Sequence, residues 1–217
     1  MSMTLPDPFY LTLGLAGIAL IPFFAVMATS FVKIAVVLGL LRNALGIQQI
    51  PPNMALYGLA IILTAYIMAP VGISAYNELS TKPISLENTQ ELKALMDTAS
   101  QPYKEFLQRH GSEDEQTFFH ETAAEIWPED VAKGLEKDSF FVLIPAFTAS
   151  ELTSAFEIGF LIYLPFLAID LIISNILLAM GMMMVSPMTI SLPFKLLLFV
   201  LMDGWTRLIH GLVLAYQ

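Results

Sequence analysis

The sequence predicts an all-α protein built from polytopic, membrane-type helical hairpins. Of its 217 residues, 56% are hydrophobic and 13% are charged, whereas ordinary soluble domains carry roughly 25% charged residues. Several apolar stretches reach the length of about 20 residues that a helix needs to cross the hydrocarbon core of a bilayer. The charged residues gather in the middle of the chain, between two apolar parts. Together these observations exclude a soluble globular protein.

Residues 1–77 are predicted to form an N-terminal hairpin of two spanning-length helices. The two uncharged runs are residues 9–32 and 43–77. Two prolines follow the start of the second run, and because proline lacks an amide donor and fixes the backbone, the chain is expected to turn there. Lys33 and Arg42 flank this turn. Bases beside membrane spans favour the cytoplasmic side, so the far end of the hairpin is expected in the periplasm or exterior.

Residues 78–138 are predicted to form a small, acidic, soluble helical domain. They hold 14 acids and 6 bases, and their apolar residues recur at the three- and four-residue spacing of amphipathic helices. The side chains expected to be buried in it include Phe118, Phe119, Ile126 and Trp127. An acidic balance excludes nucleic acid as a partner, because binding phosphates needs clustered lysine and arginine.

Residues 139–217 are predicted to form C-terminal helical hairpins. Two spanning-length segments, residues 139–169 and 171–194, precede an ambiguous apolar stretch at 196–216. Together with the first hairpin this makes four spans and one uncertain segment. A proline inside a helix removes a backbone hydrogen bond, so short helices buried against protein are expected here. The prolines are Pro145, Pro165, Pro187 and Pro193.

The few charges within the apolar parts are candidate functional residues. An ionised side chain at membrane depth is costly unless it is paired or faces water. Glu151, Asp170 and Lys195 are interpreted as pairs between helices or subunits that fix an assembly, or as groups lining an aqueous path. The alternative is that some of them lie at helix ends and reach the headgroup region.

A methionine run is the second candidate. Met182, Met183 and Met184 lie between Gly181 and Pro187, so they cannot share one helical face and a loop is expected. Flexible, unbranched methionines conform to irregular shapes. If subunits surround an axis, these loops could meet there as a compressible seal. The alternative is that the methionines fill a core or contact lipid.

Nothing in the sequence favours an enzyme. The chain has no cysteine, which excludes disulfides and thiolate metal sites. It also lacks the phosphate-binding, zinc-protease and nucleophile motifs that accompany common catalytic sites. His120 with Glu121 and Glu125 fits a solvated helix face better than a metal site. No catalytic residue, metal or cofactor is predicted.

Two long segments carry a family resemblance. Residues 29–53 read TSFVKIAVVLGLLRNALGIQQIPPN, and residues 156–187 read FEIGFLIYLPFLAIDLIISNILLAMGMMMVSP. Both closely resemble the signature blocks of the FliP/SctR (YscR-type) family of type III secretion export-gate proteins. Residues 54–70 and the stretch SLPFKLLLFVLMDGW at 191–205 extend the likeness. The first ten residues contain no base and do not look like a cleavable signal, whereas flagellar members commonly begin with one. The injectisome branch is therefore favoured.

The resemblance implies a protein-conducting function at the bacterial inner membrane, with the acidic loop on the periplasmic side. Five copies would join SctS-type and SctT-type subunits in a helical pore complex that admits unfolded secreted proteins. The positions that match the family's pore-closing loop are Met182, Met183 and Met184, while Glu151 and Lys195 match charged positions implicated in assembly. The alternative function is a four-helix small-solute transporter or ion channel subunit, which would place paired charges at a midplane site.

Overall fold

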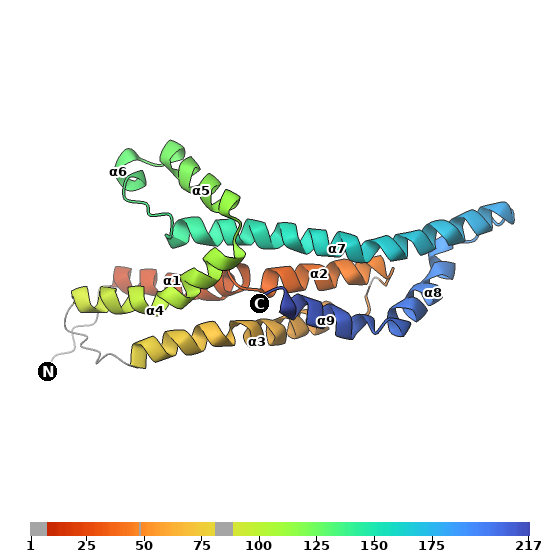
Figure 1. Ribbon diagram of the computed structural model, residues 1–217, viewed down its shortest axis with the longest axis horizontal. Coiled ribbons are helices and arrows are strands. Elements are labelled where there is room, and N and C mark those ends of the chain that lie inside the picture. The colour runs from red at the N-terminus through yellow and green to blue at the C-terminus, as the bar shows by residue number, and fades with distance from the viewer. Residues whose placement is uncertain (1–7, 48, 81–88) are drawn as a thin grey trace.

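A computed structural model of the chain describes residues 8–47, 49–80 and 89–217, and every regular element in these ranges is an α-helix (Figure 1). The helices are α1 Pro8–Met27, α2 Phe31–Ala44, α3 Asn53–Ser80, α4 Thr89–His110, α5 Glu113–Ile126, α6 Glu129–Ala132, α7 Phe140–Ala179, α8 Pro187–Leu201 and α9 Gly204–Leu214. The all-α prediction is confirmed for these residues. In the described ranges α3 and α7 are long and apolar enough to cross a membrane, and the bent pair α8–α9 makes a third if it counts as one span.

The main core joins helices from both ends of the chain. Helix α2 lies along α7 on one side and contacts α3 on the other, while α8 and α9 turn back from the far end of α7 (Figure 1). The buried side chains of this core are Ile34, Val37, Leu38, Leu56, Ala60, Leu63, Ala155 and Leu212. Gly159 of α7 lies directly against Leu40 of α2, where a Cβ atom would overlap the leucine side chain. The absence of a side chain there lets the two helices approach closely.

Helix α7 corrects two predictions made from the prolines and the uncharged runs. It runs unbroken for 40 residues through Pro145 and Pro165, so short helices are wrong for this part of the chain. Each proline leaves one carbonyl without its helical partner. A buried phenylalanine close to each proline, Phe147 near Pro145 and Phe166 after Pro165, anchors the helix there. Residues 171–194 are not one span either, because α7 ends at Ala179 and α8 begins at Pro187.

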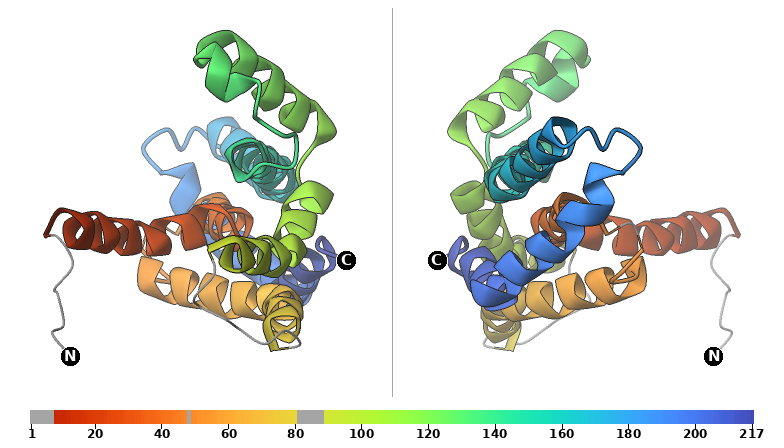
Figure 2. Two further views of the ribbon diagram at one scale, coloured as in Figure 1. Left: turned by 90° about the vertical axis from the view of Figure 1, so that its left-hand side faces the viewer. Right: turned by 90° about the vertical axis from the view of Figure 1, so that its right-hand side faces the viewer.

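A corner divides the first uncharged run into α1 and α2. Helix α1 ends at Met27, and Figure 2 shows it projecting sideways from the other helices. The carbonyls at a helix end lack intrahelical partners, and two side chains supply them here. The Thr148 hydroxyl donates to the Met27 carbonyl (3.1 Å), and the Tyr103 hydroxyl donates to the Ala28 carbonyl (2.5 Å). The break between the two helices is therefore fixed by α4 and α7.

The acidic middle of the chain forms α4, α5 and α6. Helix α4 packs on α3 and α7, where Phe106 and Leu107 join Leu143 and Phe147 in a second core. Helices α5 and α6 lie on the other side of α7 from α3 (Figure 1). Phe118 is 56% exposed and Ile126 is 71% exposed, so these two side chains are not buried in the single chain, contrary to expectation.

Candidate functional site

The methionine run lies in the turn between α7 and α8, at one extreme end of the molecule (Figure 1). Gly181 has a φ of 71°, a left-handed conformation that glycine adopts without steric cost. Its amide donates to the Leu178 carbonyl (3.0 Å), and the Met182 amide donates to the Leu177 carbonyl (2.9 Å). This pair of bonds is a Schellman motif, which satisfies the last carbonyls of a helix. Pro187 then starts α8.

The turn presents its methionines outward. Met183 is 80% exposed and Met184 is 99% exposed, while Met182 is partly covered. Within the described residues, none of the three belongs to the buried clusters of the chain. These three methionines therefore do not fill the core of this chain. Exposed apolar side chains at the tip of a long helix require a partner or lipid to cover them.

Glu151 of α7 forms a buried ion pair with Lys33 of α2. The distance from Lys33 Nζ to Glu151 Oε1 is 2.7 Å, and the glutamate side chain is 1% exposed. The Tyr216 hydroxyl donates to the other carboxylate oxygen, Oε2. Lys33 Nζ also lies 4.5 Å from the centre of the Tyr216 ring. The carboxylate is thus paired on both oxygens within one chain, as a buried charge requires.

Aromatic rings connect this pair to α4. The Tyr216 ring stacks on Phe106 at 6.1 Å and meets the His110 ring edge-on at 5.1 Å. Burial lowers the pKa of His110, and the nearby charges of Lys33 and Arg109 lower it further. His110 is therefore neutral at pH 7 and packs as an aromatic ring. No local sequence pattern points to Tyr216, because its contact with Glu151 joins residues 65 apart.

Asp170 of α7 and Lys195 of α8 form the second charge pair. Lys195 Nζ lies 2.6 Å from Asp170 Oδ2 and donates to the Ala44 carbonyl of α2 at 3.1 Å. The Ser191 hydroxyl donates to Asp170 Oδ1 at 2.6 Å. The sequence interpretation missed Ser191, although a residue four before Lys195 on a helix lies on the same face. This network fastens α8 to α7 and to the end of α2.

The remaining charges of the apolar parts behave differently. Arg42 Nη1 donates to Asn53 Oδ1 at 2.5 Å and to the Pro51 carbonyl at 3.4 Å, which holds the turn between α2 and α3. Glu157, Asp203 and Arg207 form no ion pair within the described part of the chain. Of the candidate charges, the structure therefore joins Glu151 to Lys33 and Asp170 to Lys195, in two separate pairs.

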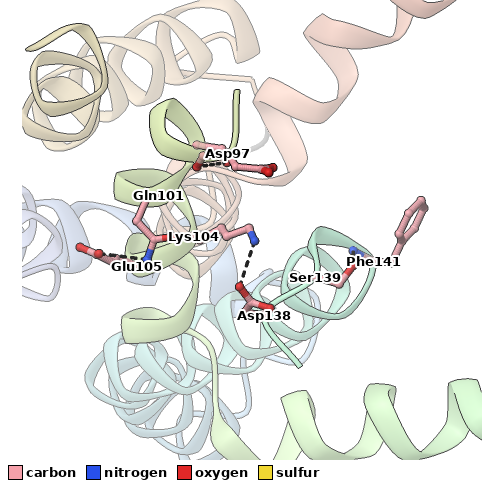
Figure 3. Close-up of polar contacts among 8 residues, drawn as sticks. Asp97, Gln101, Lys104, Glu105, Asp138, Ser139 and Phe141 are labelled. Atoms are coloured by element: carbon pink, nitrogen blue, oxygen red, sulfur yellow. Dashed lines mark hydrogen bonds and ion pairs between the residues drawn. The ribbon is translucent and has the colours of Figure 1, made fainter. Parts of the chain in front are cut away.

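A third ion pair links α4 to the segment just before α7 (Figure 3). Lys104 Nζ lies 2.9 Å from Asp138 Oδ2, just before α7 begins. The hydrogen bond from Lys104 lowers the pKa of Asp138. At the residue before Lys104, burial raises the pKa of Tyr103 to about 12, so its hydroxyl stays protonated and donates to the Ala28 carbonyl. Helix α4 is thus tied to both the segment before α7 and the corner after α1.

No group of three or more histidine or acidic side chains that could hold a metal ion occurs among residues 8–47, 49–80 and 89–217. The ring of His120, weighed above as a metal ligand, lies 3.2 Å from the Leu135 carbonyl instead. It joins α5 to the segment before α7.

Comparison with known proteins gives consistent matches along almost the whole chain. The sequence model of the FliP family matches residues 15–212. Yop proteins translocation protein R of Yersinia pestis is 62% identical over 212 residues, 98% of each chain. Hypersensitivity response secretion protein HrcR of Ralstonia nicotianae is 51% identical over 204 residues, 93% of this chain and 94% of the relative. Virulence protein YscR of Salmonella typhimurium is 51% identical over 217 residues, 99% of this chain and all of the relative.

Proposed function

Because this chain belongs to the FliP family, we propose that it is a core export-gate subunit of a bacterial type III protein secretion system. It forms the entrance pore for unfolded secreted proteins at the inner membrane. The names of its relatives refer to protein translocation, secretion and virulence, and they favour an injectisome over a flagellar system. Type III secretion proteins of this family are structural parts of a secretion apparatus rather than enzymes.

The observation that carries the proposal is the exposed methionine turn. Met182, Met183 and Met184 extend from the tip formed by α7 and α8, outside the buried clusters described for this chain. In a ring of subunits, such turns from several copies meet on the axis. Flexible thioether side chains adapt to one another and to variable objects. They close the resting pore and part when an unfolded chain enters.

The surface of the single chain supports an assembly. It exposes 14853 Å², whereas a compact monomer of 24.0 kDa exposes about 9,900 Å². The excess includes apolar residues on α3, α7 and α8. A homo-oligomer of five copies, SctS-type and SctT-type subunits and membrane lipid together cover this surface. The acidic helices α5 and α6 lie on the periplasmic side.

The two charge pairs, of which the one at Asp170 is partly exposed, serve this assembly by fixing the shape of each subunit. Glu151 holds α7 to α2, while Asp170 and Lys195 hold α8 to α7. The angle between α7 and α8 sets the direction of the methionine turn. Both charge pairs lie within one subunit, but the ring of subunits still requires them, because they fix the shape of each copy. No observation favours the alternative of a small-solute transporter.

The proposal is tested by changing Met182, Met183 and Met184 together to alanine in cells that produce the complete export apparatus. The complex is expected to assemble, but the membrane becomes permeable to ions, because alanine is too short to fill the axis. The control changes three exposed methionines outside the turn, Met27, Met54 and Met96, to alanine. Conductance equal to that of the control in an assembled complex would refute the gate.

A further inference from the structure

An apolar cavity of about 420 Å³ lies between α2, α7, α8 and α9. Its lining includes Leu41, Ile162, Phe166, Phe199 and Leu212, and it has a single charged side chain, Arg207. The volume is in the range of about 300–1,000 Å³ that is typical of ligand sites. Neither charge pair lines this cavity, and neither does the methionine turn.

Arg207 is the unusual member of this lining. It lies on α9, and it forms no ion pair within the described residues, although Asp203 lies four positions before it. Asp203 instead stands at the start of α9 with a φ of 52°. At membrane depth, an unpaired guanidinium is costly unless an anion pairs with it. The Arg207 side chain is exposed at the edge of the cavity and can reach an anion outside the chain.

We propose that the cavity binds one acyl chain of an anionic phospholipid, whose phosphate pairs with Arg207. An apolar lining offers a peptide backbone few hydrogen-bond partners, and unpaired backbone groups are costly to bury. A hydrocarbon chain has no such groups. A basic side chain at the edge of an apolar cavity between membrane helices matches the chemistry of an anionic headgroup.

The break between α8 and α9 shapes this cavity. The two helices meet at 61°, and Gly204 at the bend lies directly against the Phe199 ring, where a Cβ atom would overlap it. Gly211 also lines the cavity, and a Cβ atom there would meet nothing within 4 Å. A larger side chain at residue 211 therefore fills the cavity without disturbing the bend.

Tryptophan fluorescence can report on this site. The chain has two tryptophans, Trp127 and Trp205, and the Trp205 ring lies 5.5 Å from the Phe199 ring of the lining. In the Trp127→Phe variant of the full chain, in detergent, all tryptophan emission comes from Trp205. Dibrominated phosphatidylglycerol or phosphatidylcholine is then added, and quenching by the bromine atoms measures occupancy of the cavity.

Phosphatidylglycerol should quench Trp205 at about fivefold lower mole fraction than phosphatidylcholine, since one base near a membrane surface contributes about that factor. Arg207→Gln should remove this preference, whereas Lys137→Gln, at an exposed cation outside the cavity, should keep it. Equal quenching by the two lipids in the chain that retains Arg207 would overturn the headgroup contact.

Filling the cavity tests the acyl-chain site itself. Gly211→Leu should reduce quenching by both lipids at least about threefold, because the leucine occupies the space of the chain. The matched control is Gly72→Leu on α3, where a Cβ atom also meets nothing within 4 Å. Quenching that survives Gly211→Leu would mean that Trp205 senses bulk lipid only. An absence of quenching before any substitution would mean that protein fills the cavity, and either result overturns the proposal.

Discussion

Glu151 shows how strongly a single residue can depend on its partners. Its carboxylate is buried between Lys33 of α2 and Tyr216, which follows α9 near the other end of the chain. The sequence identifies the glutamate as a charge that needs pairing, since it interrupts an apolar stretch. It does not identify the partner, because the choice among Lys33, Arg42 and Lys195 depends on which helices pack together. The sequence therefore predicts that Glu151 needs a partner, but it does not predict which residue the partner is.

Lys33→Ala should destabilise the chain by about 3–5 kcal/mol, because removing one member of a buried pair leaves an uncompensated charge. Tyr216→Phe should cost less, about 1.5–3 kcal/mol, since it removes one hydrogen bond to a charged group. Reversible unfolding of the full chain in mixed micelles measures both values. The double variant Lys33→Met with Glu151→Leu should recover most of the loss. A Lys33→Ala chain as stable as the original would contradict this account of the pair.

The pair of Lys104 and Asp138 predicts a pH dependence. Because the folded chain lowers the pKa of Asp138, the stabilisation is complete above the ordinary aspartate pKa of about 3.9 and is lost as the pH falls through the lowered value. Asp138→Asn should reduce stability by at most about 1 kcal/mol at pH 7, as expected for a partly exposed pair.

The measurement compares the original chain with Asp138→Asn between pH 7 and pH 2.5. The difference in unfolding free energy should be constant down to about pH 4 and then shrink. Glu129→Gln, which breaks an exposed pair with Lys133 on α6, is the matched control and should have a smaller effect at pH 7. A difference that grows toward acid pH would contradict the assigned direction.

At the scale of elements, the long helix α7 is where sequence and structure differ most. Three charges and two prolines interrupt residues 139–179, which the sequence therefore suggests are separate segments. In the folded chain, α7 packs against α2, α4, α5 and α8 as one continuous helix. Local propensity could not predict this, because it depends on packing against helices elsewhere in the chain. The turn after α7 was predictable, since Gly181 and Pro187 are local signals.

Gly181→Ala tests the turn between α7 and α8. At a φ of 71°, an L-residue with a Cβ atom costs about 1–2 kcal/mol, so the variant should be less stable by that amount. Gly58→Ala is the matched control, because Gly58 lies within α3 and a Cβ atom there meets nothing within 4 Å. It should stabilise the chain by about 0.5–1 kcal/mol. Equal effects of the two substitutions in an unfolding experiment would show that the turn does not depend on its left-handed glycine.

At the scale of the whole molecule, the excess of exposed apolar surface is the dominant feature. Composition predicts it, since 13% charged residues cannot cover a surface of this size. Composition does not say whether lipid or protein provides the cover. In the proposed assembly, neighbouring subunits cover the exposed tip that carries the methionines. The projecting helix α1 offers a further apolar surface for the same purpose.

Methionine turns from several copies are proposed to meet on one axis, and cysteine cross-linking can detect such a meeting. The chain has no cysteine, so Met183→Cys introduces a single thiol. In the assembled complex, mild oxidation should link copies in pairs through residue 183. The control is Met54→Cys, an equally exposed position at the start of α3, which should remain monomeric. Monomers alone for Met183→Cys in an intact complex would contradict the account.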